Sequence, residues 1–325
     1  MSEIRRLAAI DIGTVTTRLL VADVTGESVD EVVRSTDITH LGQGLTTTGR
    51  LSNAAIGRVR DVAAGYADAI RELGVEDVSA VATSASRDAA NGDELLAVLA
   101  PLGIAVRIIG GEDEARLSFA GATWSVTGEG LLVVDVGGGS TELVFGSSVE
   151  DEGGARETTI ETMRSVDVGS RRITEMFLHG DPPSSAQLDE ARSYIASALR
   201  PFFSGLRSRP RVMVSLAGAA TTFAAIDLEL AEYDSDAVHL SCLQGARLSD
   251  LIGHLAGMSL EKRRRVVGLH PERAAVIVGG GLVMESALAL AGLDSTLISE
   301  HDILYGILLE TFSGLHAREH RLAQE

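Results

Sequence analysis

Two short segments of the chain repeat one arrangement of an acidic residue, glycine and small hydroxyl residues. The first reads AIDIGTVTT from residue 9 to residue 17, and the second reads VVDVGGGSTE from residue 133 to residue 142. An offset of 124 residues (from 11 to 135) places Asp11 on Asp135 and Gly13 on Gly137. Each segment predicts a hairpin whose tip offers backbone N–H groups to phosphate oxygens and a carboxylate to a hard cation such as Mg²⁺. Two such tips, one per domain, would clamp a phosphate chain in a cleft.

Phosphate binding is therefore assigned to the glycine and hydroxyl residues of both tips. An Asp-X-Gly sequence after a strand is by itself usually only a turn. The repeat, together with three consecutive glycines that weaken a fold without such a reason, favours the phosphate clamp. The residues assigned to it are Gly13, Thr14, Gly137, Gly138, Gly139, Ser140 and Thr141.

Two further segments carry side chains that could act on a bound phosphate. The segment TSASRD (83–88) follows an apolar strand, where ligand loops often lie in α/β folds, and Arg87 in it is a candidate phosphate clamp. The alternative is an ion pair between Arg87 and Asp88. The segment GGEDEARL (110–117) places three carboxylates in the first turn of a helix, where they favour the helix dipole. Hydrolysis also needs a base that positions water, and a glutamate here could supply it.

Other glycine and arginine clusters have two interpretations. The segments SLAGAATT (215–222) and VIVGGG (276–281) each predict a strand, a turn of small residues and a helix start. They serve either close helix–strand packing or helix N-termini that face anions. The pairs and triplets of arginine at 171–172 and 263–265 are expected on solvated helix faces, and they are the only concentrated positive charge for a polyanion.

Composition excludes several classes of protein. The 325 residues carry a net charge of −18 and only 4% aromatic residues, which argues against a nucleic-acid partner. A single cysteine, Cys242, allows no intrachain disulfide, and a single lysine, Lys262, allows no GxxxxGK[ST] phosphate loop. We find no signal peptide and no apolar run of 18 residues, and so expect a cytoplasmic protein that does not cross a membrane.

Strands alternate with helices along the chain, which predicts α/β architecture in both halves. We expect strands at 7–23, 28–36, 78–83, 105–109, 131–136, 142–146, 157–167, 211–217 and 296–299, and a loop at 84–88. The main helices are expected at 52–73, 93–99, 112–124, 186–207, 249–256, 259–267 and 302–316, with another that ends at 291. The domain boundary is placed near residue 126, which gives domains at 1–126 and 127–301.

The chain resembles the exopolyphosphatase and guanosine pentaphosphate phosphohydrolase family. The resemblance rests on the segments DIGT (11–14), TSASRDA (83–89), GEDEARL (111–117) and VDVGGGSTE (134–142), and covers about residues 5–315. It implies two ribonuclease-H-like domains of the actin, sugar-kinase and heat-shock-ATPase superfamily, an interdomain cleft, and a last helix that packs on the first domain. Val15 stands where the family commonly has a polar residue. The extra C-terminal helical domains of longer members are not expected.

The resemblance also implies the roles of four acidic residues. Glu114 matches the general base, Glu142 a second functional glutamate, and Asp11 and Asp135 the acids near Mg²⁺; we therefore assign the cation to Asp11, Asp135 and Glu142. The activity expected is Mg²⁺-dependent release of orthophosphate from inorganic polyphosphate, with guanosine pentaphosphate as the alternative substrate. A small-molecule kinase of the same superfamily and a nucleotide-gated, non-enzymatic sensor or assembly module also fit the sequence. A homodimer is compatible with it as well.

Overall fold

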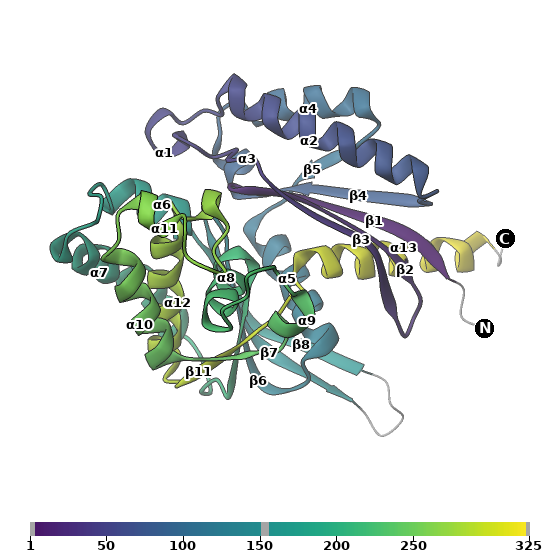
Figure 1. Ribbon diagram of the computed structural model, residues 1–325. Helices are drawn as coiled ribbons and strands as arrows, with labels where there is room; N and C mark the ends of the chain where they lie inside the picture. The colour runs from purple at the N-terminus through teal and green to yellow at the C-terminus, as the bar shows by residue number, and fades with distance from the viewer. Residues whose placement is uncertain (1–3, 151–155, 323–325) are drawn as a thin grey trace. The chain divides into compact units, whose positions relative to one another are not determined.

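The structure is a computed structural model that describes residues 4–150 and 156–322. The chain divides into two compact units, Met1–Gly121 with Ile303–Glu325, and Ala122–Asp302. Figure 1 shows that each unit is built on a β-sheet with helices packed against it. Among the described residues, no helix is both long enough and apolar enough to cross a membrane.

The sheet of the first unit has five strands in the order β3-β2-β1-β4-β5. The strands are β1 (Arg5–Ile12), β2 (Thr16–Val24), β3 (Val29–Ile38), β4 (Asp77–Ala82) and β5 (Val106–Ile108). The first three are antiparallel, whereas β4 and β5 run parallel to β1. The apolar run of β1 is buried in the middle of this sheet, as expected for a central strand with neighbours on both sides.

Helices cover both faces of this sheet. Helix α2 (Asn53–Glu72) starts at Ser52, whose side chain accepts a hydrogen bond from the Ala55 backbone N–H, and the chain turns at Gly74 in a left-handed conformation. Helices α2 and α4 (Gly92–Leu99) lie on one face, and α13 (Ile303–Leu322) lies on the other (Figure 1). The remaining elements are α1 (Leu45–Thr48), α3 (Ser84–Asp88), the 3₁₀ turn η1 (Ala100–Leu102) and α5 (Gly111–Ser125), which ends in the second unit.

Helix α13 returns the end of the chain to the first unit, where it packs on β1. A Cβ atom added at Gly306 would lie 2.0 Å from the Leu117 carbonyl oxygen of α5. The two helix backbones can therefore approach only because residue 306 is glycine.

The second unit repeats the sheet order of the first. Its strands lie in the order β10-β11-β9-β6-β7-β8, so that β8-β7-β6-β9-β11 corresponds to β3-β2-β1-β4-β5 and β10 is added at the edge. The strands are β6 (Gly128–Val136), β7 (Thr141–Glu150), β8 (Arg156–Val166), β9 (Val212–Leu216), β10 (Cys242–Gln244) and β11 (Ser295–Ile298). This duplicated α/β topology confirms the ribonuclease-H-like fold class predicted from the sequence.

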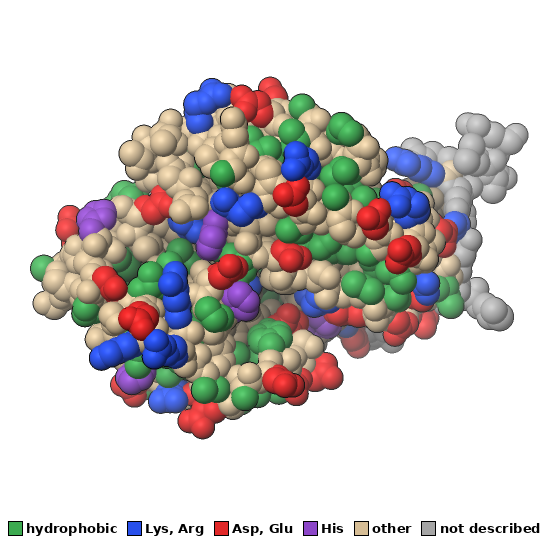
Figure 2. All heavy atoms as spheres, turned by 45° about the horizontal axis from the view of Figure 1, so that its top comes forward, with side chains coloured by type: hydrophobic (Ala, Val, Ile, Leu, Met, Phe, Trp, Pro, Cys, Tyr) green, Lys and Arg blue, Asp and Glu red, His purple; other side chains and the backbone are tan. Residues whose placement is uncertain are grey.

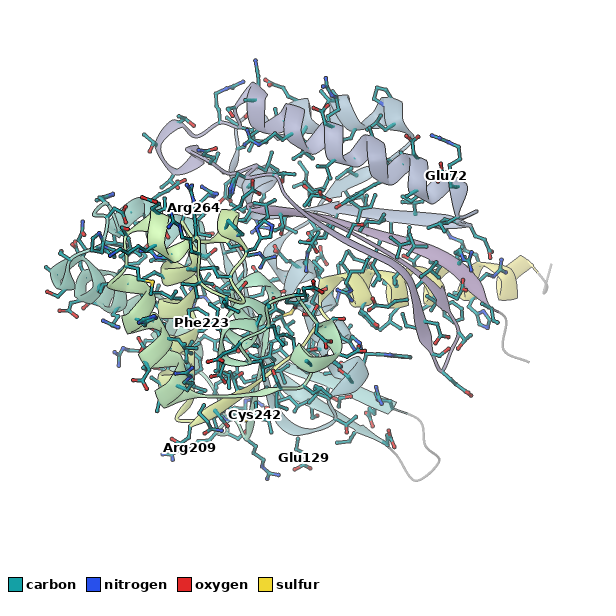
Figure 3. The ribbon with its side chains drawn as sticks, viewed as in Figure 1. Glu72, Glu129, Arg209, Phe223, Cys242 and Arg264 are labelled. Carbon is teal, nitrogen blue, oxygen red and sulfur yellow. The ribbon has the colours of Figure 1, made fainter. Side chains whose placement is uncertain are left out.

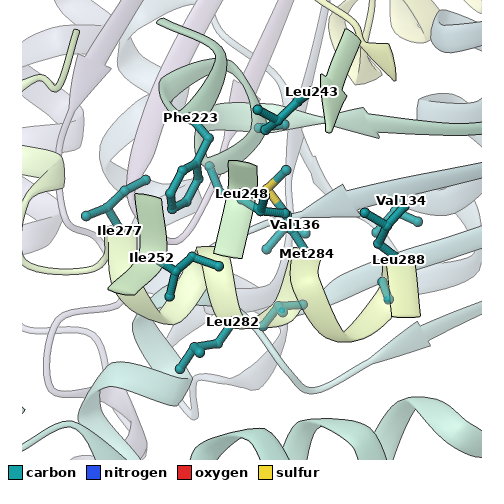
Figure 4. Close-up of a cluster of buried hydrophobic side chains, with 14 of the residues drawn as sticks. Val134, Val136, Phe223, Leu243, Leu248, Ile252, Ile277, Leu282, Met284 and Leu288 are labelled. Carbon is teal, nitrogen blue, oxygen red and sulfur yellow. The ribbon is translucent and has the colours of Figure 1, made fainter. Parts of the chain in front are cut away.

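The core of the second unit lies between this sheet and its helices. Val134 and Val136 of β6 pack there with Phe223 and Met284 from two of the helices (Figure 4). The helices are α6 (Ser170–Phe177), α7 (Ser185–Ser204), α8 (Ala217–Asp227), α9 (Ser235–Val238), α10 (Gly245–Ala256), α11 (Leu260–Arg263), the 3₁₀ turn η2 (Pro271–Arg273) and α12 (Ile277–Ala291). Cys242 is exposed on the edge strand β10 (Figure 3).

Three expectations about secondary structure are wrong. The hairpin predicted at the first tip is confirmed, so the single strand expected at 7–23 is instead β1 and β2 joined by a turn, and residues 84–88 form the short helix α3 rather than a loop. The segment 276–281 is not a strand and turn, because α12 already begins at Ile277 and contains the three glycines. A Cβ at Gly279 would lie 2.5 Å from the Ser170 carbonyl oxygen, and one at Gly281 2.5 Å from the Phe223 ring, so these glycines serve helix packing.

Candidate active site

The parallel strands of each sheet end at the same level, so the candidate residues lie together at the carboxyl ends of these strands. In the first unit Ile12 of β1 is in register with Ala82 of β4, and Ala82 with Ile108 of β5. The turn after β1, the helix that contains Arg87 and the helix that contains Glu114 therefore all leave the same edge of the sheet. Ligand-binding residues of α/β sheets commonly lie at such carboxyl ends.

The first tip is the turn between β1 and β2. The Gly13 N–H donates to the Thr16 carbonyl at 2.8 Å, which closes the turn. The carbonyl of Thr14 accepts from the Gly42 N–H at 2.9 Å, and that of Val15 accepts from the N–H groups of Thr39 and His40. The side chain of Thr14 is buried. The segment after β3 thus holds the carbonyl groups of this tip.

The second tip, between β6 and β7, closes in the same way. The Gly137 N–H donates to the Ser140 carbonyl at 3.0 Å. Ser140 and Thr141 are buried, and the Thr141 hydroxyl donates to the Val168 carbonyl. In both tips the first glycine thus uses its own N–H to close the turn. Gly13 and Gly137, which were predicted as donors to phosphate, therefore already donate to a carbonyl of the protein.

The two tips differ in the residue that faces the aspartate across the hairpin. Asp11 is in register with Arg18, and the two side chains form an ion pair of 2.7 Å with little solvent exposure. The corresponding partner of Asp135 is Glu142, which is also buried. Glu142 accepts a hydrogen bond of 2.7 Å from the hydroxyl of Ser165 on β8. In the first tip the aspartate therefore faces an arginine, whereas in the second tip the aspartate faces a glutamate.

The acids of the second tip fit a divalent cation. Like charges placed directly opposite each other on a sheet are destabilising, and a bound cation would offset this. Mg²⁺ is commonly held by one or two carboxylates together with waters and substrate phosphates. Across residues 4–150 and 156–322, no group of three or more His, Cys, Asp and Glu side chains could hold a metal ion. Asp135 and Glu142 could supply two carboxylates to such a site, with waters and phosphate oxygens as the other ligands.

Arg87 and Glu114 meet in the first unit. The Arg87 Nη1 atom lies 3.2 Å from the Glu114 Oε2 atom and also donates to the Ile109 carbonyl at 3.0 Å. The alternative partner from the sequence, Asp88, instead accepts from the Ser84 hydroxyl. The Glu114 side chain is only 10% exposed. A carboxylate in this setting has a fixed position, which a group that orients water requires.

Two arginine clusters do not form the solvated faces expected from the sequence. Arg171 is buried and pairs with Glu175, and Arg263 is buried with hydrogen bonds to the carbonyls of Leu255, Met258 and Ala274. Burial lowers the pKa of the Arg263 guanidinium from its ordinary value. Arg264 (Figure 3) and Arg265 are exposed. The charge left for a polyanion is therefore smaller than the sequence indicates, and Figure 2 shows acidic and basic side chains interspersed on the visible face.

Arg18 and Gly169, which lie near the tips, were missed from the sequence, and Arg172 was expected only as part of a charged helix face. The hairpin register would have revealed Arg18, because a turn closed between Gly13 and Thr16 aligns Asp11 with Arg18. Arg172 donates from its Nε atom to the Gly139 carbonyl at 2.7 Å. Gly169 lies so close to Gly138 that an added Cβ would be 2.6 Å from its carbonyl. No local pattern identifies these two contacts, because they join segments about thirty residues apart.

The sequence and the fold of this chain are similar to those of known proteins. The family model described as the Ppx/GppA phosphatase family matches residues 20–312. The chain is 40% identical to Exopolyphosphatase 2 of Mycobacterium tuberculosis, over 94% of this chain and 98% of that protein. A crystal structure described as an exopolyphosphatase-like protein matches with a TM-score of 0.88 at 34% identity, covering 95% of this chain and 98% of the other. The Aquifex aeolicus Ppx/GppA family member matches with a TM-score of 0.79 at 30% identity, covering 96% and 99%. The chain belongs to the Ppx/GppA phosphatase family.

Proposed function

We propose that this protein hydrolyses the terminal phosphoanhydride bond of inorganic polyphosphate and releases orthophosphate. The observation that carries the proposal is membership of the phosphatase family, combined with a match to an exopolyphosphatase over nearly the full length of both chains. The two hairpin tips, which follow the central strands β1 and β6 and close in the same way, support the proposal. Guanosine pentaphosphate is the alternative substrate, because it presents the same kind of terminal anhydride.

In the proposed mechanism Glu114 orients the attacking water and accepts its proton. Arg87 holds the Glu114 carboxylate, while its own position is fixed by the Ile109 carbonyl. The guanidinium is also a suitable partner for a phosphate oxygen, so Arg87 would lie between the base and the substrate. Phosphoryl transfer needs positioning and charge stabilisation, and no covalent intermediate with the protein is required.

The two tips bind the phosphate chain in this proposal. Gly13 and Gly137 close the turns with their own N–H groups, and the Thr141 hydroxyl donates to Val168, so these three residues shape the tips. Contact with phosphate oxygens is assigned to Thr14 in the first tip and to Gly138, Gly139 and Ser140 in the second. Asp135 and Glu142 would hold Mg²⁺, which when bound supplies positive charge that stabilises the leaving phosphate oxygen. Asp11 is already paired with Arg18, so we assign it to the organisation of the first tip rather than to the cation.

A direct assay of phosphate release tests the proposal. The purified protein is incubated with polyphosphate or with guanosine pentaphosphate, in the presence of Mg²⁺ and without any acceptor molecule. We expect orthophosphate from polyphosphate with the larger kcat/KM. A larger kcat/KM for guanosine pentaphosphate would favour the alternative substrate. Turnover that needs an acceptor sugar or acid would point to a kinase, and binding of nucleotide without turnover would point to a sensor or assembly module.

A further inference from the structure

Helix α6 begins directly behind the second tip and contacts its carbonyl groups. The Ser170 N–H donates to the Gly137 carbonyl at 2.9 Å, and the N–H groups of Arg171 and Arg172 donate to the Gly138 carbonyl at 2.9 Å and 3.1 Å. The Nε atom of Arg172 donates to the Gly139 carbonyl at 2.7 Å. Three consecutive carbonyl groups of the tip are thus held by the first turn of one helix and by one side chain of it.

These contacts determine where the N–H groups of the tip point. In a trans peptide the N–H of one residue lies opposite the carbonyl of the residue before it. Because the carbonyls of residues 137, 138 and 139 all face α6, the N–H groups of Gly138, Gly139 and Ser140 face the opposite side. The tip therefore presents three successive donors on one side, which is the arrangement that binds phosphate oxygens.

The contact between α6 and the tip leaves no room for a side chain. A Cβ added at Gly169 would lie 2.6 Å from the carbonyl carbon and oxygen of Gly138 and 2.6 Å from the carbonyl carbon of Gly139. The backbone of Gly169 has φ −140° and ψ 166°, which any residue can adopt. Glycine is therefore required at this position by the close approach of the tip, and not by its own backbone conformation.

Helix α6 is in turn held from behind by α12. A Cβ at Gly279 would lie 2.5 Å from the Ser170 carbonyl oxygen, and one at Gly280 would lie 3.2 Å from the Ser170 Cβ. The glycines of α12 thus let α6 sit close to it. Helix α6 is packed between α12 and the tip, and because α12 lies directly behind it, α6 cannot move away from the tip.

We propose that α6, with Gly169 and Arg172, is the positioning element of the second phosphate-binding tip. It fixes the three peptide planes, and its N-terminal dipole and the Arg172 charge polarise the carbonyls so that the opposite N–H groups become stronger donors. Arg172 and Gly169 act through the tip and are positioning residues. The inference rests on the proposed function, because it assigns a terminal phosphate to these donors.

The Gly169→Ala variant tests the close approach. The added methyl group must push the tip and α6 apart, so the N–H groups of Gly138, Gly139 and Ser140 no longer point in the same direction. We expect KM for tripolyphosphate to rise about tenfold or more, as expected when hydrogen bonds to a charged group are weakened, while kcat changes much less. The matched control is Gly253→Ala on α10, where an added Cβ has no neighbour within 4 Å. Loss of folded protein alone would lower the apparent kcat and leave KM unchanged.

An Arg172 series tests the side-chain part independently. Arg172→Lys keeps a charged donor and should keep KM within about threefold of wild type, whereas Arg172→Met removes donor and charge and should raise KM about tenfold. Arg172→Gln, which keeps a donor without charge, should lie between them. Inhibition by orthophosphate is measured in parallel and should weaken in the same order as KM rises.

The outcomes separate this inference from the proposed function. A wild-type protein that releases no phosphate from either substrate contradicts the proposed function, whatever the variants do. If the wild type is active, and Gly169→Ala and Arg172→Met both keep its KM and its inhibition by orthophosphate, α6 does not position the tip. A rise in KM for Gly169→Ala and for Arg172→Met, with recovery in Arg172→Lys, supports the inference.

Discussion

The two hairpin tips share one backbone design and differ in charge. Each closes through an N–H of glycine that donates to a carbonyl three residues later, between Gly13 and Thr16 and between Gly137 and Ser140. Across the hairpin, however, the first tip pairs Asp11 with Arg18, whereas the second pairs Asp135 with Glu142. The position that faces the aspartate thus holds a basic residue in the first tip and an acidic residue in the second.

The tips are also supported differently. In the first, the carbonyls of Thr14 and Val15 accept from backbone N–H groups of the segment 39–42. In the second, a helix start and the guanidinium of Arg172 take this place, so positive charge lies behind the tip. In the proposed mechanism the two units therefore have different roles: the first unit supplies the base Glu114, and the second unit supplies the cation site and the polarised donors.

The largest expected effect comes from Glu114→Gln, which tests the base assigned to the first unit. Removal of a general base typically costs about 10² to 10⁴ in rate, so kcat should fall by that factor. The Mg²⁺ concentration at half-maximal activity should not move, because the proposed cation ligands Asp135 and Glu142 belong to the second unit. Glu112→Gln, at an exposed position of the same helix turn, is the control. A Glu114→Gln enzyme with more than half of the wild-type kcat would remove Glu114 from the mechanism.

A smaller but more specific effect is expected when the cation site is altered. Asp135→Asn and Glu142→Gln should each lower kcat/KM about tenfold or more and raise the Mg²⁺ midpoint, because a neutral amide is a weaker ligand for a hard cation. Asp11→Asn should leave the midpoint unchanged, because Asp11 is paired with Arg18. Binding of Mn²⁺ can be measured without turnover, as the decrease in the EPR signal of free Mn²⁺. Asp135→Asn and Glu142→Gln should weaken this binding, whereas Asp11→Asn should not. Equal loss of Mn²⁺ binding in all three variants would contradict the assignment of the cation to the second tip.

A substitution at the first tip should lower the free energy of unfolding. Arg18→Met leaves Asp11 without the arginine that neutralises it, and breaking a largely buried ion pair costs about 3 kcal/mol. The free energy of unfolding is measured by urea denaturation. Arg60→Met provides the control, because the pair Arg60–Asp61 is more than half exposed and such pairs contribute less than about 1 kcal/mol. Equal losses in the two variants would show that Arg18 and Asp11 do not form a special pair.

Local patterns predicted most elements of the fold. The helix expected at 52–73 is α2, with its cap at Ser52 and its end before Gly74, and the central strands of both sheets were identified from apolar runs. The three glycines at 279–281 misled the prediction, because glycine is usually a poor helix residue. Contacts of α12 with Ser170 and Phe223 outweigh that propensity, and they are invisible to any local window.

The sequence was sufficient to predict which residue types form the candidate site, but it predicted only some of the contacts between them. The repeated motif identified both aspartates and both tips, and the hairpin register, had it been applied, would have identified Arg18 as well. The contact between Arg87 and Glu114 depends on the positions of β4 and β5 in the sheet, so the sequence could offer only the neighbour Asp88. Likewise, the burial of Arg171 and Arg263 follows from tertiary packing, which turned two expected surface clusters into partly internal ones.

The smallest expected effect tests what the two tips share. Substitution of Gly13 or Gly137 by alanine would place a Cβ 3.2 Å from the Thr16 carbonyl oxygen or 3.1 Å from the Ser140 carbonyl oxygen. Neither glycine has a positive φ, so the cost is crowding alone, about 1 kcal/mol in each case, and the two losses in unfolding free energy should be nearly equal. Urea denaturation of both variants measures it. A much larger loss at Gly137 than at Gly13 would mean that the tips are not equivalent even in their backbone, and that charge is not the main difference between them.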